Sequence, residues 1–298
     1  MAEDAKITAI IPVRNRPDVI HRALDSIVAQ SLPVQEIIVV DDGSTDDTPE
    51  QVEARIDRTP GLRLIRQPQA GGAPRARNAG AAAASGEFLA FLDSDDAWTP
   101  EKLRLQIAAL QAAPDCPAVF CSTLYRFRGK KPQIITPPAV TRLEDLHFRN
   151  VLGGASLAVV RKSAFDAVGG FRPDMPSCQD WELWLKLAAL GDLLTVQEPL
   201  VEYFFDGGGR ITKNIANVLK GHEIVYGSIC EQLADDPRRV RKVRGEHQRR
   251  LADIFSRHHF APGRAMLHIT RALTTDPSPR RVLDVPRVLG RLATYPLI

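Results

Sequence analysis

Acidic side chains follow two short apolar runs within the first hundred residues of the chain. Asp41 and Asp42 come directly after Glu36-Ile-Ile-Val-Val40, and Asp93-Ser94-Asp95-Asp96 comes directly after Phe88-Leu-Ala-Phe-Leu92. Carboxylates crowded at the end of a buried strand repel one another and lose solvation unless a cation or hydrogen-bond donors compensate. Hard oxygen ligands of this kind suit Mg²⁺ or Mn²⁺, which share their coordination with substrate phosphates. The second cluster therefore predicts a divalent metal site, and the alternative interpretation is an acidic turn without a ligand.

The elements that must position these carboxylates alternate between strand and helix. The apolar runs predict buried strands at residues 7–13, 36–40, 62–65 and 88–92. Helical patterns fall between them, at residues 18–30, from an N-cap at Thr48 onward, and at 73–85. This alternation indicates an α/β fold with a mostly parallel sheet covered by helices. Ligands bind outside the carboxyl ends of such strands, so the two acidic clusters should converge on one cleft with Pro12–Asn15.

Composition places the chain among ordinary globular proteins. Its 298 residues are 44% hydrophobic and 25% charged, which allows one large domain or one domain with a substantial appendage. No apolar run approaches the ~18 residues of a membrane helix, and the N-terminus lacks a signal-peptide pattern. We therefore expect a cytoplasmic protein. The four cysteines show no metal-binding spacing, which favours reduced thiols.

Charge is distributed unevenly along the chain. Residues 1–209 carry 22 Lys and Arg against 28 Asp and Glu, a net charge of −6, whereas residues 210–298 carry 17 against 8, a net charge of +9. The glycine triplet at 207–209 marks a plausible boundary, and the pattern beyond it is helical. We predict a first domain at 1–209 and a basic α-helical C-terminal region at 210–298. The basic residues lack interleaved aromatics, so no nucleic-acid partner is expected.

Two other interpretations of the acidic strand ends fail on spacing. A dinucleotide-binding fold needs G-x-G-x-x-G after the first strand, and Pro12-Val-Arg-Asn-Arg-Pro17 contains no glycine. The run Asp41–Asp47 lacks the terminal Glu and the spacing of an EF-hand calcium loop. A dehydrogenase and an EF-hand are therefore set aside.

Five motifs together resemble family 2 glycosyltransferases of the GT-A fold. They cover about residues 5–209 and occur in the family's order and spacing, at Ile10-Ile-Pro-Val-Arg-Asn15, Ile38-Val-Val-Asp-Asp-Gly-Ser44, Ala76-Arg-Asn-Ala-Gly80, Leu92-Asp-Ser-Asp-Asp96 and Gln179-Asp-Trp-Glu-Leu-Trp184. The resemblance implies a Rossmann-like nucleotide-binding half and a mixed acceptor half. It also implies transfer of a sugar from a nucleotide-diphosphate donor, with inversion at the anomeric carbon.

The resemblance implies roles for individual positions. Asp180 matches the catalytic base, and Asp95 with Asp93 matches the Asp-x-Asp that holds Mn²⁺ or Mg²⁺ as cofactor. The expected nucleotide-sugar-binding residues are Pro12, Val13, Arg14, Asn15, Asp41, Asp42, Arg75, Arg77, Asp93 and Ser94. Among them Asp42 is favoured as the carboxylate that binds the base or ribose, whereas Arg75 and Arg77 are both candidates for the diphosphate.

The chain departs from the family pattern at two places. Relatives often carry Tyr-Arg-x-His where this chain has Tyr203-Phe-Phe-Asp206, so Asp206 is a candidate replacement metal ligand. Gln179 stands before the base, where Glu is usual. The Gln-x-x-Arg-Trp signature of processive synthases is absent, which favours addition of a single sugar per encounter.

We therefore expect an inverting glycosyltransferase with a donor of the UDP type. The expected acceptor is a cell-surface glycan or a lipid-linked precursor, with peripheral contact of the basic C-terminal helices to the inner face of the cell membrane. Two alternatives stay open from the residues alone. One is a sugar-nucleotide nucleotidyltransferase, and the other is a non-catalytic nucleotide-sugar-binding or scaffold protein.

Overall fold

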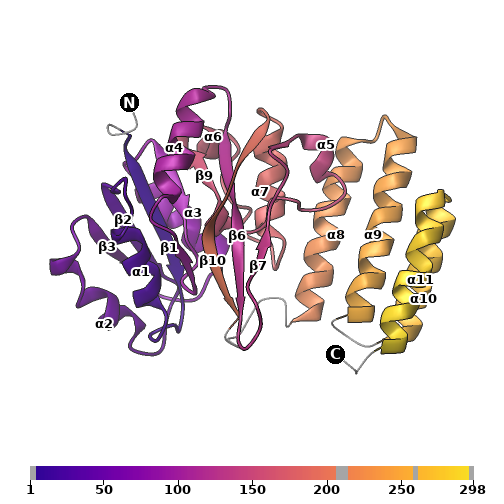
Figure 1. The fold of residues 1–298 in the computed structure, drawn as a ribbon, viewed down its shortest axis with the longest axis horizontal. Helices are drawn as coiled ribbons and strands as arrows, with labels where there is room; N and C mark the ends of the chain where they lie inside the picture. The colour runs from indigo at the N-terminus through magenta and orange to yellow at the C-terminus, as the bar shows by residue number, and fades with distance from the viewer. Residues whose placement is uncertain (1–4, 206–213, 258–260, 295–298) are drawn as a thin grey trace. The chain divides into compact units, whose positions relative to one another are not determined.

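The computed structural model describes residues 5–205, 214–257 and 261–294. The chain divides into two compact units. Unit 1 comprises residues 1–175 and 179–208, and unit 2 comprises residues 176–178 and 209–298. Unit 1 contains a sheet with surrounding helices, and unit 2 contains helices α8 to α11 (Figure 1).

The strands of unit 1 form one mixed ten-stranded sheet. Their bounds are β1 Ile7–Val13, β2 Glu36–Asp41, β3 Leu62–Arg66, β4 Phe88–Phe91, β5 Asp96–Trp98, β6 Ala118–Phe127, β7 Gln133–Ile135, β8 Val140–Thr141, β9 Val159–Arg161 and β10 Leu193–Phe205. The order along the sheet is β3-β2-β1-β4-β9-β6-β10-β5, while β7 pairs with β6 and β8 with β10.

Parallel pairing of β1 with β2 and with β4 sets where the polar loops meet. Val13 pairs with Asp41, and Ile10 pairs with Phe91, so the carboxyl ends of the three strands lie at one edge. All seven residues of β1 are buried, which explains its uninterrupted apolar sequence. Beyond β4 the sheet becomes mixed, because β9 runs antiparallel to both β4 and β6. The predicted α/β fold is confirmed, with an antiparallel portion beyond β4.

Seven α-helices and two short 3₁₀ turns are described in unit 1. They are α1 Ile20–Val28, α2 Thr48–Glu53, η2 Ile56–Arg58, α3 Ala73–Ala83, α4 Lys102–Ala112, α5 Leu143–Leu146, η3 Ala155–Leu157, α6 Lys162–Ala167 and α7 Gln179–Ala188. The prediction that Thr48 caps α2 was wrong. Thr48 is its first residue, and both the backbone N–H and the hydroxyl of Thr48 donate to Asp46 Oδ1, at 3.0 and 2.6 Å.

Helix α3 lies unusually close to the sheet. A Cβ on Gly80 would come within 2.6 Å of Ile10 Cγ2, so only glycine allows this approach to β1. The close contact fixes the position of α3 relative to the strand ends. Because Arg77 lies one turn before Gly80, the same contact directs its side chain into the interior of unit 1, where it is 3% exposed.

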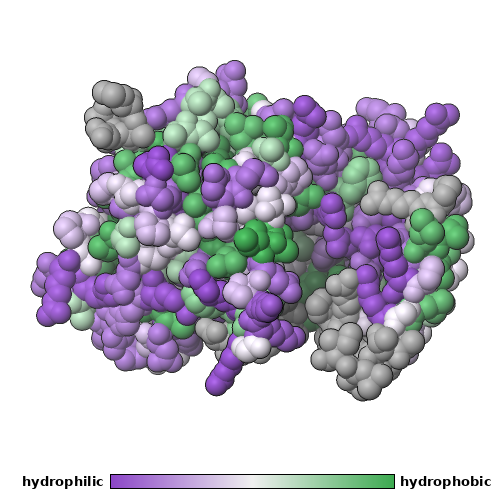
Figure 2. Space-filling model, in the orientation of Figure 1, coloured by the Kyte–Doolittle hydropathy of each residue, from purple (hydrophilic) through white to green (hydrophobic). Residues whose placement is uncertain are grey.

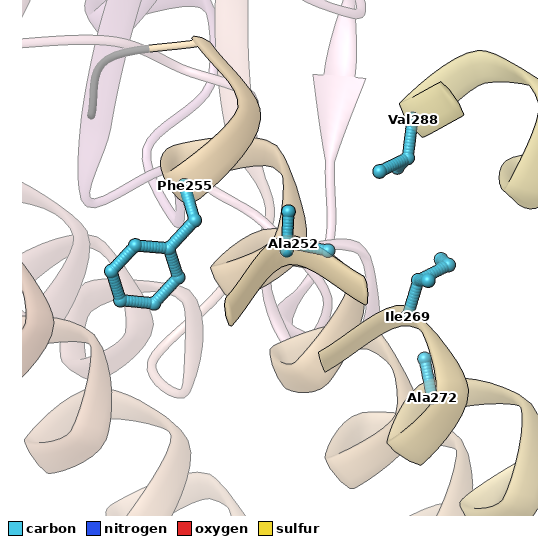
Figure 3. Packing of buried hydrophobic residues seen from close by; sticks show 6 residues of the cluster. Ala252, Phe255, Ile269, Ala272 and Val288 are labelled. Carbon is cyan, nitrogen blue, oxygen red and sulfur yellow. The ribbon is translucent and has the colours of Figure 1, made fainter. Parts of the chain in front are cut away.

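Unit 2 consists of α8 Ile215–Gln232, α9 Pro237–Arg257, α10 Pro262–Thr275 and α11 Pro279–Thr294. Its core is formed by small and aliphatic residues with one aromatic ring, Ala252, Phe255, Ala265, Ile269, Ala272 and Val288. Figure 3 shows Val288 of α11 and Ile269 of α10 on either side of the space between these helices. The expected helical C-terminal region is thus confirmed.

No helix among the described residues combines the length and the apolar character needed to cross a membrane.

Candidate active site

The carboxyl end of β1 forms a hydrogen-bonded junction with the loop after β2. Asn15 has a positive φ of 51°, a conformation that asparagine tolerates better than most residues. Its backbone N–H donates to Ser44 Oγ at 2.9 Å, and its Oδ1 accepts from the Thr45 N–H at 2.9 Å. Pro12 and Val13 are buried, whereas Arg14 is exposed. The structure therefore brings Pro12–Asn15 against the loop that carries Asp41 and Asp42.

Asp41 and Asp42 both accept backbone hydrogen bonds within this junction. The carboxylate of Asp41 accepts from the Ser44 N–H, at 3.3 and 3.2 Å to its two oxygens. The two oxygens of Asp42 accept from the N–H groups of Gly71 and Gly72, at 2.6 and 2.9 Å. Asp42 thereby fixes the turn that leads into α3, a role that sequence reasoning did not foresee. Each carboxylate oxygen retains acceptor capacity for a ligand.

An open hollow of about 490 Å³ lies beside this turn. It is lined by Gln67, Pro68, Gln69, Ala70, Gly71, Arg75 and Pro173.

The two candidate arginines of α3 point to different surroundings. Arg75 is exposed and lines the hollow. Arg77 is 3% exposed, and its Nη2 donates to Asp93 Oδ1 at 2.5 Å. The side chain of Asp93 is 34% exposed, so this ion pair joins a buried cation to a carboxylate that reaches the surface. The structure thus links Arg77, and not Arg75, to the acidic cluster after β4.

Ser156 and Arg22 hold the acidic turn in place. The Asp93 N–H donates to Ser156 Oγ at 3.0 Å, and the Ser156 hydroxyl donates to Asp96 Oδ2 at 2.6 Å. Arg22 Nη2 donates to the backbone carbonyl of Asp95 at 2.6 Å. The Asp96 N–H closes the turn on the Asp93 carbonyl at 3.0 Å. Ser94 is buried inside the turn, whereas Asp93 and Asp95 remain partly exposed.

Asp180 lies in the first turn of α7, close to the same cluster. Burial raises the pKa of Asp180 to about 6; the Arg77 guanidinium opposes this rise, and the Asp93 carboxylate adds to it. A carboxyl group with a pKa near neutrality is suited to accept a proton during a reaction. The structure therefore groups Arg77, Asp93 and Asp180, which lie far apart in the sequence, into one electrostatic cluster.

Hydrogen bonding within this cluster is incomplete. Arg77 Nε, Arg77 Nη1 and Asp180 Oδ1 are buried, and none of the three has a hydrogen-bond partner among the described residues. Buried polar atoms normally have such a partner, and exceptions require an explanation. Donors on Arg77 match an anionic oxygen of a ligand, whereas the acceptor on Asp180 matches a hydroxyl.

The carboxylates match a metal shared with a substrate better than a metal held by the protein alone. The described part of the chain contains no group of three or more His, Cys, Asp or Glu that could hold a metal ion. A Mg²⁺-type ion bound through one or two carboxylates and substrate phosphates does not need such a group. Asp93 and Asp95 fit that arrangement, with Asp93 already paired to Arg77. Asp206 lies outside the described residues.

A family model described as glycosyl transferase family 2 matches residues 8–169, which is more than half of the chain. The chain belongs to glycosyl transferase family 2. Two curated relatives are an uncharacterized glycosyltransferase of Rickettsia felis, 26% identical over 77% of this chain, and the succinoglycan biosynthesis protein ExoO of Rhizobium meliloti, 37% identical over 47%. The chain spans 39% and 40% of their lengths.

A solved structure extends the similarity over most of the chain. S. aureus TarS 1–349 in complex with UDP-GlcNAc has a TM-score of 0.61 and 17% identity, with 93% of this chain and 92% of that one covered. This likeness shows the GT-A-type fold that the sequence motifs predicted. Membership of this family favours a glycosyltransferase over the nucleotidyltransferase alternative.

Sequence reasoning missed three residues of this glycosyltransferase site. Ser156 and Arg22 carry no motif, because their role depends on hydrogen bonds to the acidic turn across long sequence separations. Tyr203 matches the tyrosine of the family's Tyr-Arg-x-His, but the sequence analysis gave it no role. It pairs with Asp96 across β10 and β5, and the pKa of its phenol is raised by burial and by the carboxylates of Asp96, Asp93 and Asp180.

Proposed function

We propose that this family 2 member is an inverting glycosyltransferase with Asp180 as its general base. The observation that carries the proposal is the cluster of Arg77, Asp93 and Asp180, in which buried donors and a buried acceptor have no partner among the described residues. A sugar donor brings an anionic diphosphate, and an acceptor brings a hydroxyl. Together they supply the hydrogen-bond partners that these atoms lack.

The proposed reaction is a single displacement. The acceptor hydroxyl oxygen attacks the anomeric carbon from the face opposite the diphosphate, and Asp180 takes the hydroxyl proton as the new C–O bond forms. The bond between the anomeric carbon and the diphosphate oxygen breaks, and its electron pair leaves with the nucleoside diphosphate. Attack from the opposite face inverts the anomeric centre. General-base help of this kind contributes on the order of 10²–10⁴ in rate.

Negative charge develops on the departing diphosphate, and Arg77 is proposed to stabilise it. Its side chain is held by Asp93 and enclosed by unit 1, so little reorganisation is needed when charge appears. Mn²⁺ or Mg²⁺, held by Asp95 and Asp93, would neutralise further diphosphate charge when bound. Arg75, at the rim of the hollow, is available to a different part of the donor.

A UDP-type donor is proposed because the structural neighbour TarS was solved with UDP-GlcNAc. A cell-surface glycan or its lipid-linked precursor is proposed as acceptor, since the relative ExoO is named for succinoglycan biosynthesis. The base and ribose are assigned to the junction of Pro12–Asn15 with Asp41 and Asp42, where backbone and carboxylate groups converge.

Thermal unfolding with nucleotides tests this assignment. UDP, GDP, TDP and CMP would each be added with and without Mn²⁺ to the wild type and to Asp95→Ala. We expect one diphosphate to raise the midpoint in a manganese-dependent manner in the wild type only, because a ligand that binds the folded form stabilises it by about 2.7 kcal/mol at 100-fold over its Kd. Absence of stabilisation by every nucleotide would contradict the proposal.

A second proposal is that unit 2 contacts an anionic membrane surface. In α11 the side chains of Val282, Leu283 and Leu289 are 61%, 62% and 46% exposed, and Figure 2 shows hydrophobic residues along this helix. Helix α9 adds a run of exposed basic residues, Arg238, Arg241, Lys242 and Arg244. Apolar side chains beside cationic ones are the combination found in helices that bind the surface of anionic bilayers.

Vesicle flotation distinguishes this contact from non-specific adsorption. The protein should float with phosphatidylcholine vesicles that contain phosphatidylglycerol and not with pure phosphatidylcholine. Leu283→Glu should abolish flotation, whereas Val28→Glu should not, because Val28 is a comparably exposed apolar residue on α1 (58%). Equal flotation of the two variants would overturn the proposal.

A further inference from the structure

Four aromatic rings form an array at the ends of β6 and β10. Tyr125 and Phe127 belong to β6, and Tyr203 and Phe205 belong to β10. The strands are parallel, with Tyr203 opposite Tyr125 and Phe205 opposite Phe127. Residues two apart in a strand share one face of the sheet, so all four rings project from the same face.

The rings contact one another as a continuous surface. Tyr125 stacks on Tyr203 with centroids 5.5 Å apart and planes 20° apart, and Phe127 stacks on Phe205 at 4.4 Å and 30°. Tyr125 also contacts Phe205 at 5.2 Å, which joins the two pairs. Such contacts fix the orientation of each ring. The array, defined as Tyr125, Phe127, Tyr203 and Phe205, is therefore a preformed surface.

The residues of this aromatic array are only partly buried, unlike the aromatic residues of the core. Phe88, Phe91, Phe120 and Phe171 are at most 2% exposed, whereas the four residues of the array are each partly exposed, with the phenol end of Tyr203 buried. Strand β6 is fully buried from Ala118 to Thr123 and becomes accessible from Leu124 onward. Aromatic surface left accessible beside a polar site indicates ligand contact more than core packing.

The opposite face of the same strand ends is engaged by charged groups of unit 1. Arg126 forms an ion pair with Glu202, and the Arg22 guanidinium lies over the Phe204 ring at 3.7 Å. Arg22 in turn donates to the Asp95 carbonyl. The alternating residues thus separate into a face with cationic partners, Arg126 and Arg22, and an aromatic face.

Tyr203, at one end of the aromatic array, lies beside the carboxylates that are proposed to take part in the reaction. Tyr203 lies opposite Asp96 in the β10–β5 pair. A Cβ built on Gly154 would lie 2.8 Å from Tyr203 Oη and 3.8 Å from Asp180 Oδ2, so both atoms lie beside the same glycine. An acceptor with its hydroxyl at Asp180 would therefore meet Tyr203 first and the other three rings beyond it.

We propose that the aromatic array is the acceptor subsite and that it binds the C–H face of an acceptor sugar ring. This inference rests on the proposed function of Asp180. The negative face of an aromatic ring attracts the C–H bonds of a pyranose, while the ring hydroxyls of the sugar remain at the rim for polar contacts. Tyr203 positions the sugar nearest the reaction, and Phe127 and Phe205 bind the sugar or aglycone behind it. The substrate class is accordingly a glycan acceptor.

Saturation-transfer NMR tests the subsite with defined probes. Methyl β-glycosides of glucose, galactose and N-acetylglucosamine would be added to the protein with UDP and Mn²⁺ present, and farnesyl phosphate would be measured separately. We expect transfer to the ring C–H protons of at least one glycoside. Phe127→Leu and Phe205→Leu keep an apolar side chain and should reduce that transfer at least fivefold.

Arg126→Ala is the matched control, since it removes a large side chain between two rings but from the opposite face, and it should retain the transfer. Titration with UDP should give the same Kd in all variants, which separates this subsite from donor binding. Loss of UDP binding in the wild type would overturn the proposed function itself. If UDP binding is intact, any of three results would overturn the acceptor subsite. These are no saturation transfer to a glycoside, saturation transfer that neither Phe variant reduces, and saturation transfer to farnesyl protons alone.

Discussion

Unit 1 and unit 2 each bury an arginine among carboxylates, but the two guanidinium groups differ in how many of their N–H donors have a partner. In unit 1, Arg77 is 3% exposed and forms an ion pair with Asp93, while its Nε and Nη1 find no hydrogen-bond partner among the described residues. In unit 2, Arg281 is 4% exposed and contacts three carboxylates, Glu246 at 2.7 Å, Asp276 at 3.1 Å and Asp284 at 3.5 Å.

The remaining members of the unit 2 network reinforce that difference. Arg249 pairs with Glu246 at 2.5 Å and with Asp253 at 2.7 Å, and Arg291 also pairs with Asp253. These contacts join α9 to α11, and Arg281 also joins α11 to Asp276, the residue that follows α10. A buried polar network in which every group has a hydrogen-bond partner specifies a structure. A network with partnerless donors or acceptors can still bind a ligand through them. The difference is consistent with a folding role for the buried charge of unit 2 and supports the proposal that the buried charge of unit 1 serves a ligand.

The largest expected effect is on catalysis in unit 1. Asp180→Asn should reduce the release of UDP from UDP-GlcNAc by a factor on the order of 10²–10⁴, because the amide cannot accept the proton. The same substitution should stabilise the protein at pH 8 by about 2 kcal/mol, since it removes a buried carboxylate whose pKa is raised to about 6. Activity and urea unfolding would be measured on the same preparation. A variant that is inactive and also less stable would contradict the comparison.

In unit 2 the corresponding substitution should affect stability alone. Arg281→Met leaves Glu246, Asp276 and Asp284 without their shared cation and should destabilise unit 2 by about 3–5 kcal/mol. Hydrogen–deuterium exchange of α9 and α11 peptides measures this directly. The matched control is Arg287→Met, because Arg287 is 68% exposed and pairs with the same Asp284; its effect should stay within about 0.5 kcal/mol. Unchanged exchange in Arg281→Met would show that the network does not hold the helices together.

Acidification should act in opposite directions on the buried histidines of unit 2 and on Asp180 of unit 1. Burial lowers the pKa of His222 and of His247 to about 4, with neighbouring cationic groups adding to the shift. Their neutral forms are favoured in the folded state, so unit 2 should lose roughly 2 kcal/mol per histidine as the pH falls from about 6.5 to about 4. Asp180 has a raised pKa, so its contribution to the stability of unit 1 grows over the range from about 6 down to about 4.

Exchange measured at pH 7 and pH 5 on peptides from each unit separates these effects. His247→Phe should remove part of the acid sensitivity of unit 2. The His247 ring stacks on Tyr226 with their centroids 4.5 Å apart, and Phe would preserve this stacking without a titrating group. Equal acid sensitivity in wild type and variant would exclude His247 as a cause.

The smallest expected effect concerns the acidic turn. Ser156→Ala removes the hydroxyl that accepts from the Asp93 N–H and donates to Asp96. We expect a loss of about 1–3 kcal/mol in unfolding free energy and a modest rise in KM for the donor, with the midpoint of unit 2 unchanged. Ser85→Ala serves as the control, because Ser85 is exposed, lies two residues after α3 and loses only a long surface hydrogen bond of 3.3 Å to Glu36. An unaltered KM would mean that the turn keeps its geometry without Ser156.

The local sequence was sufficient to predict the strands that carry the site. β1 spans the predicted residues 7–13, because an apolar run that ends in Pro-Val-Arg-Asn has few alternatives. The meeting of the carboxyl ends of β1, β2 and β4 at one edge of the sheet followed from their parallel pairing. Thr48 was misassigned as a cap because its hydroxyl donates to Asp46 Oδ1, while the Gln51 N–H that it would have capped donates to the Asp47 carbonyl.

Long-range contacts were not predictable from spacing. Arg75 and Arg77 are indistinguishable in the sequence, and only the packing of α3 on β1 sends Arg77 inward to Asp93. The basic residues of the C-terminal helices predicted contact with a membrane surface and gave no sign of a buried ion-pair network, yet Arg281 is buried with carboxylates from α9 and α11 and with Asp276. The aromatic array likewise depends on the register between β6 and β10.

The most direct test of the unit 1 account is calorimetric titration of UDP with Mn²⁺ into the wild type, Arg77→Met, Arg77→Lys and Arg281→Met. The account predicts that Arg77→Met weakens UDP binding roughly 10–100-fold, as expected for losing hydrogen bonds from a charged group worth about 1.5–3 kcal/mol. Arg77→Lys should recover part of that affinity, and folded Arg281→Met should bind as the wild type does. Equal UDP affinity in Arg77→Met and the wild type would contradict the claim that the partnerless nitrogens of Arg77 serve the donor diphosphate.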